Sequence, residues 1–233
     1  MIASVFEHIG LSETHQDVTR NIVSLRISED LFDDLSADPA AWAAAIALET
    51  EAKPPTFKSK LPSIERPFKE AIWNDAIQYP FKNWMRSRYS DGSFGVWYGG
   101  DSIETTVAET AHHWRSQLLA DAGFLQPGVK IDRNVFQVRL DAALLDLRAA
   151  VPHFPALVDP VDLNLTQQIG GKLHREGHPG LLTKSARCAG DTFAVLNPAV
   201  LSDPRPVCFL TYTLMPGGRV EIEREPGSVW ISA

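Results

Sequence analysis

The stretch SRYSDGSFGVWYGGDSIETTVAETAHHW, residues 87–114, places a strand pattern directly before a helix pattern. Phe94, Val96 and Tyr98 occupy alternate positions, which predicts a strand over residues 94–98 with these three side chains on one face and Trp97 on the other. Beyond the glycines that follow, apolar residues recur at helical spacing along one stripe, namely Ile103, Val107, Ala111, Trp114 and Leu118. The stretch therefore predicts a strand that turns sharply into an amphipathic helix.

The predicted helix has a recognisable start and a polar side. Asp101, with Glu104 three residues later, resembles a capping box, which satisfies free backbone N–H groups of the first turn. Glu109 falls opposite the apolar stripe, on the side that also carries Thr105, His112 and Ser116. A strand end, a turn and about two helical turns separate Tyr98 from Glu109, so both side chains can reach one cleft.

The remaining strand patterns cluster late in the chain. We expect strands over residues 18–28 and 135–141, and a hairpin around residues 216–218. The segment GLLTKSARCAGDTFAVLNP, residues 180–198, predicts a strand, a loop that carries Ser185, and a second strand. Helices are few: an alanine-rich one follows Asp38 and stops before Pro54, and a short one covers residues 163–177. This order favours an α+β fold over a regular alternation of strands and helices.

The length of 233 residues suits one large domain or one domain with an extension. We divide the chain into an N-terminal strand and helical extension, residues 1–79, and a core domain, residues 80–233. The two parts are expected to pack as one compact domain. Residues 54–80 are rich in Pro, Lys and Ser, which indicates linking structure with a short helix.

Composition argues against several classes of protein. Hydrophobic residues make up 44% and charged residues 22%, as in soluble globular proteins. The net charge of -7, from 22 Lys and Arg against 29 Asp and Glu, disfavours direct nucleic-acid binding. The N-terminus lacks a signal-peptide pattern and no apolar run is long enough to span a membrane, so we expect a cytoplasmic protein. Cys188 and Cys208 are expected to be reduced and buried.

Common catalytic and cofactor motifs are missing from the sequence. It contains no phosphate-binding P-loop, no dinucleotide G-x-G-x-x-G, no G-x-S-x-G nucleophile elbow and no paired C-x-x-C knuckles. HREGH, from His174 to His178, offers two histidines at helical spacing and raises the hypothesis of a metal-dependent hydrolase. Gly177 and Pro179 break a helix there, so a polar loop is the better interpretation and no metal is expected.

The side chains of the opening stretch suit a charged ligand that contains rings. The guanidinium of Arg88 can hold a pyrophosphate through two hydrogen bonds, and the ring of Tyr98 can stack on a flat heterocycle. The carboxylate of Glu109 can accept from ribose hydroxyls and stabilise a cationic, sugar-like transition state. Spacing alone also fits a plain alternative: a surface arginine, a core tyrosine and an exposed glutamate.

The stretch resembles the RES domain family, which is named for arginine, glutamate and serine. The family pattern contains a strand that ends in tyrosine, a helix that bears glutamate, and a late segment of the form G-apolar-x-x-x-S-x-R-x-x-G. Tyr98 and Glu109 match the first two features, and Ser185 in GLLTKSARCAG matches the serine. Arg26, in NIVSLRIS, matches the first arginine. The family's Gly-Gly-Arg-Trp-Asn turn is replaced here, so Arg88 is assigned with Arg86 as its competitor.

The resemblance implies an ADP-ribosyltransferase-like fold with a mixed or antiparallel β core and flanking helices. It also implies a toxin of a bacterial toxin–antitoxin pair that consumes NAD⁺ by cleaving the bond between nicotinamide and ribose. Glu109 would stabilise the developing positive charge on ribose, Arg26 and Arg88 would hold the diphosphate, and Tyr98 would stack on nicotinamide. Ser185 would contact the ligand or orient a neighbour.

The resemblance also implies a protein partner, an Xre-like antitoxin that covers the NAD⁺ cleft. It leaves the acceptor of ADP-ribose open: water, phosphate or a protein side chain. The protein is therefore expected to be either an NAD⁺ glycohydrolase or phosphorylase, or an ADP-ribosyltransferase that modifies a protein. A non-catalytic module that keeps the fold and binds NAD⁺ or an antitoxin stays a further alternative.

Overall fold

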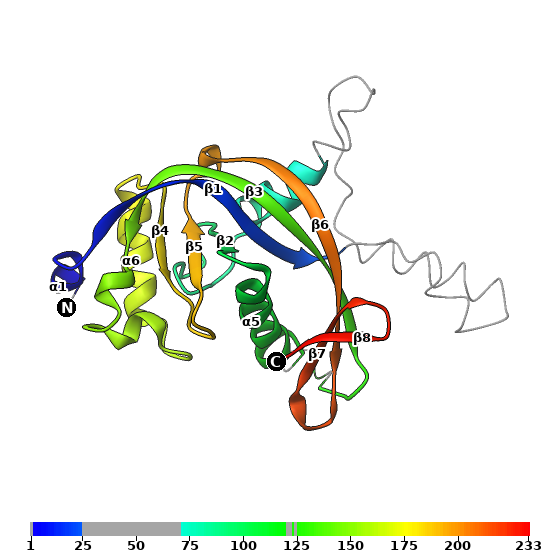
Figure 1. Ribbon diagram of the computed structural model, residues 1–233. Coiled ribbons are helices and arrows are strands. Elements are labelled where there is room, and N and C mark those ends of the chain that lie inside the picture. The colour runs from blue at the N-terminus through cyan, green and yellow to red at the C-terminus, as the bar shows by residue number, and fades with distance from the viewer. Residues whose placement is uncertain (1, 25–70, 120–122, 124) are drawn as a thin grey trace, which may run out of the picture. The chain divides into compact units, whose positions relative to one another are not determined.

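Eight strands pair into one sheet in the computed structural model, which describes residues 2–24, 71–119, 123 and 125–233 (Figure 1). The strand order is β1-β2-β5-β4-β3-β6-β7-β8. Arg26 and the alanine-rich helix expected after Asp38 lie outside the described residues. The strands are β1 (Gly10–Val23), β2 (Trp97–Gly100), β3 (Lys130–Asp146), β4 (Gly180–Lys184), β5 (Asp191–Val195), β6 (Leu201–Leu214), β7 (Val220–Glu225) and β8 (Ser228–Ser232).

Short helical segments flank this sheet. The two longest regular helices of the described residues are α5 (Ile103–His113) and α6 (Asn164–Arg175). The others are α1 (Ile2–Phe6), η1 (Asn74–Gln78), α4 (Tyr79–Lys82), η2 (Trp114–Leu119), η3 (Arg148–Ala150), η4 (Pro155–Val158), η5 (Pro198–Val200) and η6 (Pro216–Gly218). The expected α+β class is confirmed, because all strand pairs of the described residues are antiparallel except β3 with β4.

Five of the strands close into a ring. β1 pairs with β3, β3 with β4, β4 with β5, β5 with β2, and β2 returns to β1 through Thr19 and Gly100. Beyond the ring, β3 continues into a meander with β6, β7 and β8. The long strands β1, β3 and β6 arch over α5 in Figure 1, so this helix lies on the concave side of the sheet.

Three hydrophobic clusters hold the elements together. The first packs α6 and α1 against β4 and β5, with Ile169, Leu181 and Val5 fully buried. The second gathers side chains from all five ring strands and from η1, including Val18 and Trp97, and so fills the ring. The third packs the apolar stripe of α5 against the β6–β7 hairpin. Burial of apolar surface in these clusters is the main stabilising contribution.

The strands expected over residues 94–98 and 18–28 have different bounds in the structure. Phe94, Gly95 and Val96 precede β2 without ladder partners, because this segment passes directly against helix α4. A side-chain carbon on Gly95 would lie 2.1 Å from the carbonyl oxygen of Pro80. The predicted faces are confirmed, since Phe94 and Tyr98 pack in the first cluster and Trp97 in the second. The other strand, β1, begins at Gly10, inside the segment assigned to the N-terminal extension.

The start of α5 differs from the expected capping box. Ser102, not Asp101, is the N-cap, and its Oγ accepts a hydrogen bond from the backbone N–H of Thr105 at 3.1 Å. Asp101 instead accepts from the Thr105 hydroxyl at 2.5 Å and from the backbone N–H of Asp191 at 2.9 Å. The carboxylate that the sequence assigned to helix capping therefore joins the helix to β5.

The later elements agree with the sequence patterns. Helix α6 ends at Arg175, and Gly177 has a φ of 75°, so the helix stops inside HREGH as expected. The hairpin β6–β7 turns at η6, and β8, which the sequence patterns missed, adds a last strand.

The two cysteines differ in exposure. Cys208 is half-buried but Cys188 is exposed, which corrects the expectation that both are buried. Across the described ranges, no helix is long and apolar enough to cross a membrane.

Candidate active site at Glu109 and Ser185

The carboxylate of Glu109 contacts the loop between β4 and β5. Its Oε1 accepts a hydrogen bond from the hydroxyl of Ser185 at 2.5 Å and another from the backbone N–H of Ala186 at 3.1 Å. Glu109 lies on α5 and Ser185 directly follows β4, so two separate elements meet at this oxygen. Two sequence-predicted site residues are therefore in direct contact.

The loop that carries Ser185 is held closed by its own backbone. The N–H of Ser185 donates to the carbonyl of Gly190 at 2.9 Å, which continues the β4–β5 ladder by one pair. The Oγ of Ser185 also accepts from the N–H groups of Arg187 and Cys188, at 3.0 and 3.2 Å. With two donors on its oxygen, the hydroxyl is oriented to give its proton to Glu109. Ser185 is thus placed as a residue that positions the carboxylate.

Arg187 is a site residue that sequence reasoning did not assign. Its Nη2 donates to the carbonyl of Pro160 at 2.8 Å, while its Nε is buried and finds no hydrogen-bond partner among the described residues. Burial lowers the pKa of this guanidinium, the charge of Glu109 opposes that effect, and the charges of Arg88 and Arg115 add to it. Arg187 follows Ser185 by two positions, so the S-x-R part of the family pattern was the signal for it.

A cleft of about 220 Å³ lies along the helix that carries Glu109, although Glu109 itself does not line it. Its lining residues come from α5, from η2, from the β4–β5 loop and from the C-terminal part of the chain: Ala108, Ala111, His112, Arg115, Arg187, Val220 and Ala233. Arg115 is fixed by a hydrogen bond of 3.0 Å from its Nη1 to the carbonyl of Gly218. Burial, then the charges of Arg187 and Arg115, lower the pKa of His112. The neutral imidazole is therefore favoured at His112, and the positive charge of the cleft comes from Arg115 and Arg187, which would attract an anionic group.

Arg88 lies near this cleft on a short turn before β2. Its Nη1 donates to the carbonyl of Asp159 at 2.9 Å, and its charge acts on Arg187. The competing Arg86 is exposed, so the geometry favours Arg88 as the arginine of this turn. The neighbouring Tyr89 is 1% exposed, and burial raises the pKa of its hydroxyl to about 12. The charge of Glu109 adds to this increase, and the charge of Arg88 opposes it.

Tyr98 has a different environment from the one expected. Its hydroxyl lies 2.9 Å from the Oγ of Ser87 and accepts from the backbone N–H of Tyr89 at 2.9 Å. Its ring packs against the first hydrophobic cluster, and burial raises the pKa of the phenol. Among the contacts of the described residues, Tyr98 meets the turn that carries Arg88 and not Glu109. The predicted stacking of this ring on a ligand stays a prediction.

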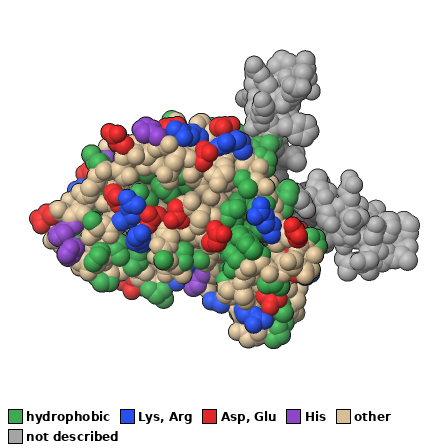
Figure 2. All heavy atoms as spheres, viewed as in Figure 1, with side chains coloured by type: hydrophobic (Ala, Val, Ile, Leu, Met, Phe, Trp, Pro, Cys, Tyr) green, Lys and Arg blue, Asp and Glu red, His purple; other side chains and the backbone are tan. Residues whose placement is uncertain are grey.

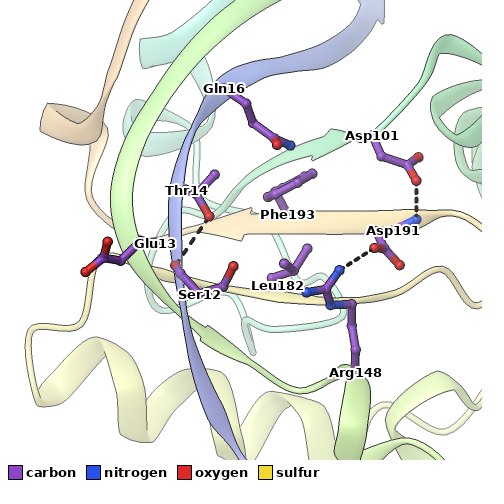
Figure 3. Close-up of a pocket in the computed structure, with 9 residues that line it drawn as sticks. All are labelled: Ser12, Glu13, Thr14, Gln16, Asp101, Arg148, Leu182, Asp191 and Phe193. Carbon is purple, nitrogen blue, oxygen red and sulfur yellow. Dashed lines mark hydrogen bonds and ion pairs between the residues drawn. The ribbon is translucent and has the colours of Figure 1, made fainter.

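A larger cavity of about 320 Å³ opens at the ring of strands (Figure 3). Ser12, Thr14 and Gln16 of β1 line it on one side, and Leu182 and Phe193 of β4 and β5 lie opposite. Asp101, Arg148 and Asp191 close it with a polar network. None of the assigned site residues that the structure describes lines this cavity or the smaller cleft, although Arg187 of the Ser185 loop lines the smaller one.

The histidines of HREGH have separate environments. The ring of His174 stacks on Phe94 with centroids 4.2 Å apart, and the Nε2 of His178 lies 3.5 Å from a carboxylate oxygen of Glu176. Within residues 2–24 and the later described ranges, no group of three or more His, Cys, Asp or Glu could hold a metal ion. On the face shown in Figure 2, basic and acidic side chains are interspersed.

Comparison with known proteins identifies the family. The sequence profile described as the RES domain matches residues 60–215, which is most of the chain and includes Glu109 and Ser185. The chain belongs to the RES domain family. No curated protein matches it at a significant level. Among solved structures, it resembles a chain of the M. tuberculosis MbcT–MbcA toxin–antitoxin complex, with a TM-score of 0.47 and 14% identity over 92% of each chain.

Proposed function

We propose that this RES domain protein cleaves NAD⁺ between nicotinamide and ribose and acts as the toxin of a toxin–antitoxin pair. One observation carries the proposal: the hydrogen bonds from the described residues to the Glu109 carboxylate all end on one of its two oxygens. Its Oε1 accepts both hydrogen bonds from the β4–β5 loop, while Oε2 accepts none from the described residues. A carboxylate fixed on one side and free on the other can accept a hydrogen bond from a sugar hydroxyl.

The chemistry needs a carboxylate in this state. When the bond to nicotinamide breaks, nicotinamide leaves with the bonding electron pair and positive charge develops on the ribose. A negative charge held against the ribose stabilises that transition state more than the ground state, and only such a difference accelerates the step. Glu109 supplies the charge through Oε2, and Ser185 keeps the carboxylate from rotating away. No nucleophilic role for Ser185 is needed.

The cationic surroundings suit the diphosphate of the substrate. The side chain of Arg187 lines the same cleft as Arg115 and His112. Arg88 adds a fourth basic group from the turn before β2. Guanidinium groups bind phosphate oxygens through paired hydrogen bonds, so these arginines hold the diphosphate while Glu109 contacts the ribose. Arg26 lies outside the described residues, and its role in diphosphate binding stays part of the proposal.

We extend the proposal to an antitoxin as the protein partner. Two large apolar side chains, Trp84 and Met85, are 59% and 64% exposed just before the turn that carries Arg88. Exposed apolar groups next to the turn of Arg88 suit a protein partner that covers this turn and blocks substrate entry. The Xre-like character of this antitoxin and the absence of direct DNA contact by the toxin are part of the proposal.

The decisive experiment is an assay of nicotinamide release from NAD⁺, run in buffer, with added phosphate and with cell extract. We expect release by the wild type and its loss, by a factor of at least about 100, in Glu109→Gln. Glu104→Gln, an exposed glutamate on the same helix, is the matched control and should keep full activity. A folded wild-type protein that releases no nicotinamide under any of these conditions would refute the proposal.

The same assay separates the possible acceptors. Labelled NAD⁺ incubated with extract and analysed for a labelled protein tests the ADP-ribosyltransferase alternative. Release of nicotinamide together with free ADP-ribose and no labelled protein would exclude protein modification. A rate that rises with phosphate would identify phosphate as the acceptor instead of water.

A further inference from the structure

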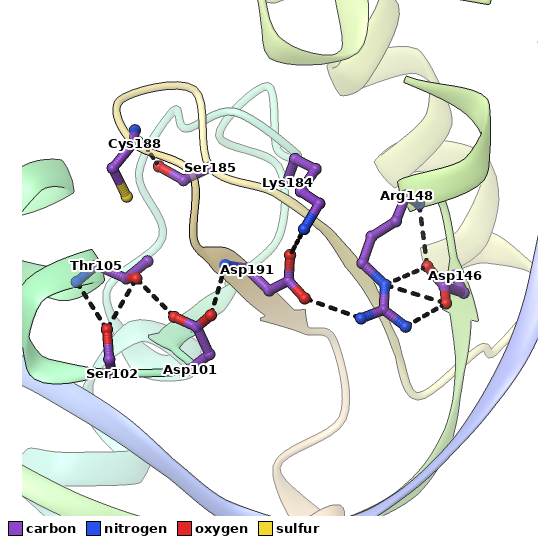
Figure 4. A network of polar contacts seen from close by, with 9 residues as sticks. All are labelled: Asp101, Ser102, Thr105, Asp146, Arg148, Lys184, Ser185, Cys188 and Asp191. Atoms are coloured by element: carbon purple, nitrogen blue, oxygen red, sulfur yellow. Dashed lines mark hydrogen bonds and ion pairs between the residues drawn. The ribbon is translucent and has the colours of Figure 1, made fainter. Parts of the chain in front are cut away.

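A network of polar contacts joins the first turn of α5 to the β4–β5 hairpin (Figure 4). The candidate active site uses only the loop end of this hairpin, where Ser185 meets Glu109. The network lies at the other end of the contact, around Asp101 and Asp191. It bonds the helix to the hairpin through Asp101.

Asp101 makes the central link. Its Oδ1 accepts from the hydroxyl of Thr105 on α5 at 2.5 Å, and its Oδ2 accepts from the backbone N–H of Asp191 on β5 at 2.9 Å. Its own backbone N–H donates to the carbonyl of Asp191 at 3.0 Å. One residue is therefore bonded both to the helix and, at two points, to the strand.

Asp191 is in turn fixed from the hairpin and from the segment after β3. Its Oδ1 accepts from the Nζ of Lys184 at 2.5 Å, across the last pair of the β4–β5 ladder. Its Oδ2 accepts from the Nη1 of Arg148 at 2.8 Å, and Arg148 is also bonded to Asp146 through Nε and Nη2. Two cationic side chains, Lys184 and Arg148, therefore hold the carboxylate of Asp191, the residue to which Asp101 is bonded.

The helix and the hairpin loop meet along one helix face. Thr105 and Glu109 are one turn apart on α5, and residues at this spacing lie side by side. Thr105 is 3% exposed, and a side-chain carbon on Gly190 would lie 2.0 Å from its hydroxyl oxygen. Thr105 therefore packs directly on Gly190 at one end of the loop, while Glu109 contacts Ser185 at the other end.

We propose that Asp101 is a positioning residue for Glu109, which sets the register of α5 against the β4–β5 hairpin so that the carboxylate meets Ser185. The residue does not touch the reacting atoms. It acts through its hydrogen bonds to Asp191 and to Thr105, which packs on Gly190. The proposal rests on the proposed function for its kinetic consequences, whereas its structural consequence is independent of any activity.

The kinetic test is a double-mutant cycle with Ser185. Asp101→Ala should lower kcat for nicotinamide release by about tenfold, the factor expected for hydrogen bonds to a charged group, with KM changed less than about twofold. If Asp101 acts through the Ser185–Glu109 contact, the same substitution should change kcat by less than about twofold in a Ser185→Ala background. Equal effects in both backgrounds would overturn the proposal. Asp101→Asn, which keeps one acceptor oxygen, should recover part of the loss.

The matched control is Asp132→Ala. Asp132 also accepts a hydrogen bond from a threonine hydroxyl, that of Thr211 at 2.7 Å, but it lies in the β3–β6 ladder. The Asp132→Ala variant should therefore keep a kcat within about twofold of the wild-type value. A loss as large as that of Asp101→Ala would indicate a general effect of removing such a pair and would overturn the specific role of Asp101.

The structural test needs no turnover. The backbone N–H of Ala186 donates to Glu109, so its hydrogen exchange reports whether helix and loop are in register. Asp101→Ala should increase the exchange rate of this amide by about tenfold while the amides of the β1–β3 ladder stay protected. Unchanged exchange at Ala186 in a folded variant would overturn the inference. If the wild type releases no nicotinamide, the proposed function fails and this measurement alone decides the role of Asp101.

Discussion

The hydroxyl of Tyr98 accepts a hydrogen bond from the backbone N–H of Tyr89 at 2.9 Å. The same hydroxyl lies 2.9 Å from the Oγ of Ser87, so one phenol contacts both residues that flank Arg88. The tyrosine at the end of β2 therefore holds the turn that presents the arginine. This relationship gives Tyr98 a role that does not require its ring to touch a ligand.

Tyr98→Phe separates the two roles of this residue. The variant keeps the ring but leaves the Tyr89 N–H without its acceptor, and an unsatisfied buried donor costs about 1–3 kcal/mol. We expect the turn to shift and KM for NAD⁺ to rise by about tenfold, measured in the nicotinamide assay. Stacking alone would predict an unchanged KM.

The control for Tyr98→Phe is Tyr79→Phe. Tyr79 is 46% exposed on α4, and loss of its hydroxyl should leave KM and kcat unchanged. If both variants behave like the wild type, the hydrogen bond to Tyr89 has no part in presenting Arg88.

Arg187→Gln tests the cationic cleft. The guanidinium of Arg187 lines the cleft and is expected to bind a phosphate oxygen, so its loss should raise KM for NAD⁺ by about tenfold or more and change kcat less. Arg187→Lys keeps the charge but not the fork of donors, and should recover only part of the affinity. Arg175→Gln, an exposed arginine at the end of α6, should have no effect. Equal KM values for all variants would remove Arg187 from the site.

Helix α6 packs against the turn of Arg88 through Gly170. A side-chain carbon there would lie 1.9 Å from the carbonyl oxygen of Tyr89, so Gly170→Ala must displace the helix or the turn. We expect a loss of about 1–3 kcal/mol in the free energy of unfolding, measured by urea titration. At Gly171 the nearest atom is the flexible end of Arg175 at 3.3 Å. Gly171→Ala should therefore be neutral or stabilise by up to about 1 kcal/mol, because alanine favours helix.

The sequence predicted local elements better than the contacts between them. Helical spacing identified the apolar stripe of α5, and alternation identified the faces of Phe94 and Trp97, because both depend only on neighbours along the chain. Asp101 was misassigned because a capping box is recognised from residue types alone, whereas its real partner, Asp191, lies 90 residues away.

The site was predicted in part for the same reason. Ser185 and Glu109 were named through the family resemblance, and their contact spans 76 residues of sequence that no periodicity describes. Arg187 was overlooked although it stands in the same motif, because a buried donor without a partner is visible only in three dimensions. The sequence analysis predicted that the ring of Tyr98 stacks on a ligand. It missed the hydrogen bond that the Tyr98 hydroxyl accepts from the backbone N–H of Tyr89, because no sequence pattern marks such a partner.

Asp146 and Asp75 should give opposite pH dependences of stability. At Asp146, burial raises the carboxyl pKa, but the hydrogen bonds and charge of Arg148 outweigh it, so the pKa lies below the usual 3.8. The unfolded chain then binds more protons, and stability is present above pH 3.8 and lost as the pH falls through the folded-state pKa. Asp146→Asn should lower the free energy of unfolding at pH 7 by roughly 1 kcal/mol, a small amount because the Asp146–Arg148 pair is partly exposed. The variant should also lose less stability than the wild type as the pH falls below 3.8.

Asp75 has the reverse sign. Burial raises its pKa above 3.8, so ionisation opposes folding, and stability falls as the pH rises through the folded-state pKa. Asp75→Asn should therefore stabilise the protein at pH 7, whereas the gain should vanish below pH 3.8, where the wild-type carboxyl is protonated in both states. Urea titrations of both variants from about pH 3 to 7 check the two signs together. A gain from Asp146→Asn at pH 7, or a loss from Asp75→Asn, would contradict the charge environments seen around these two carboxyl groups.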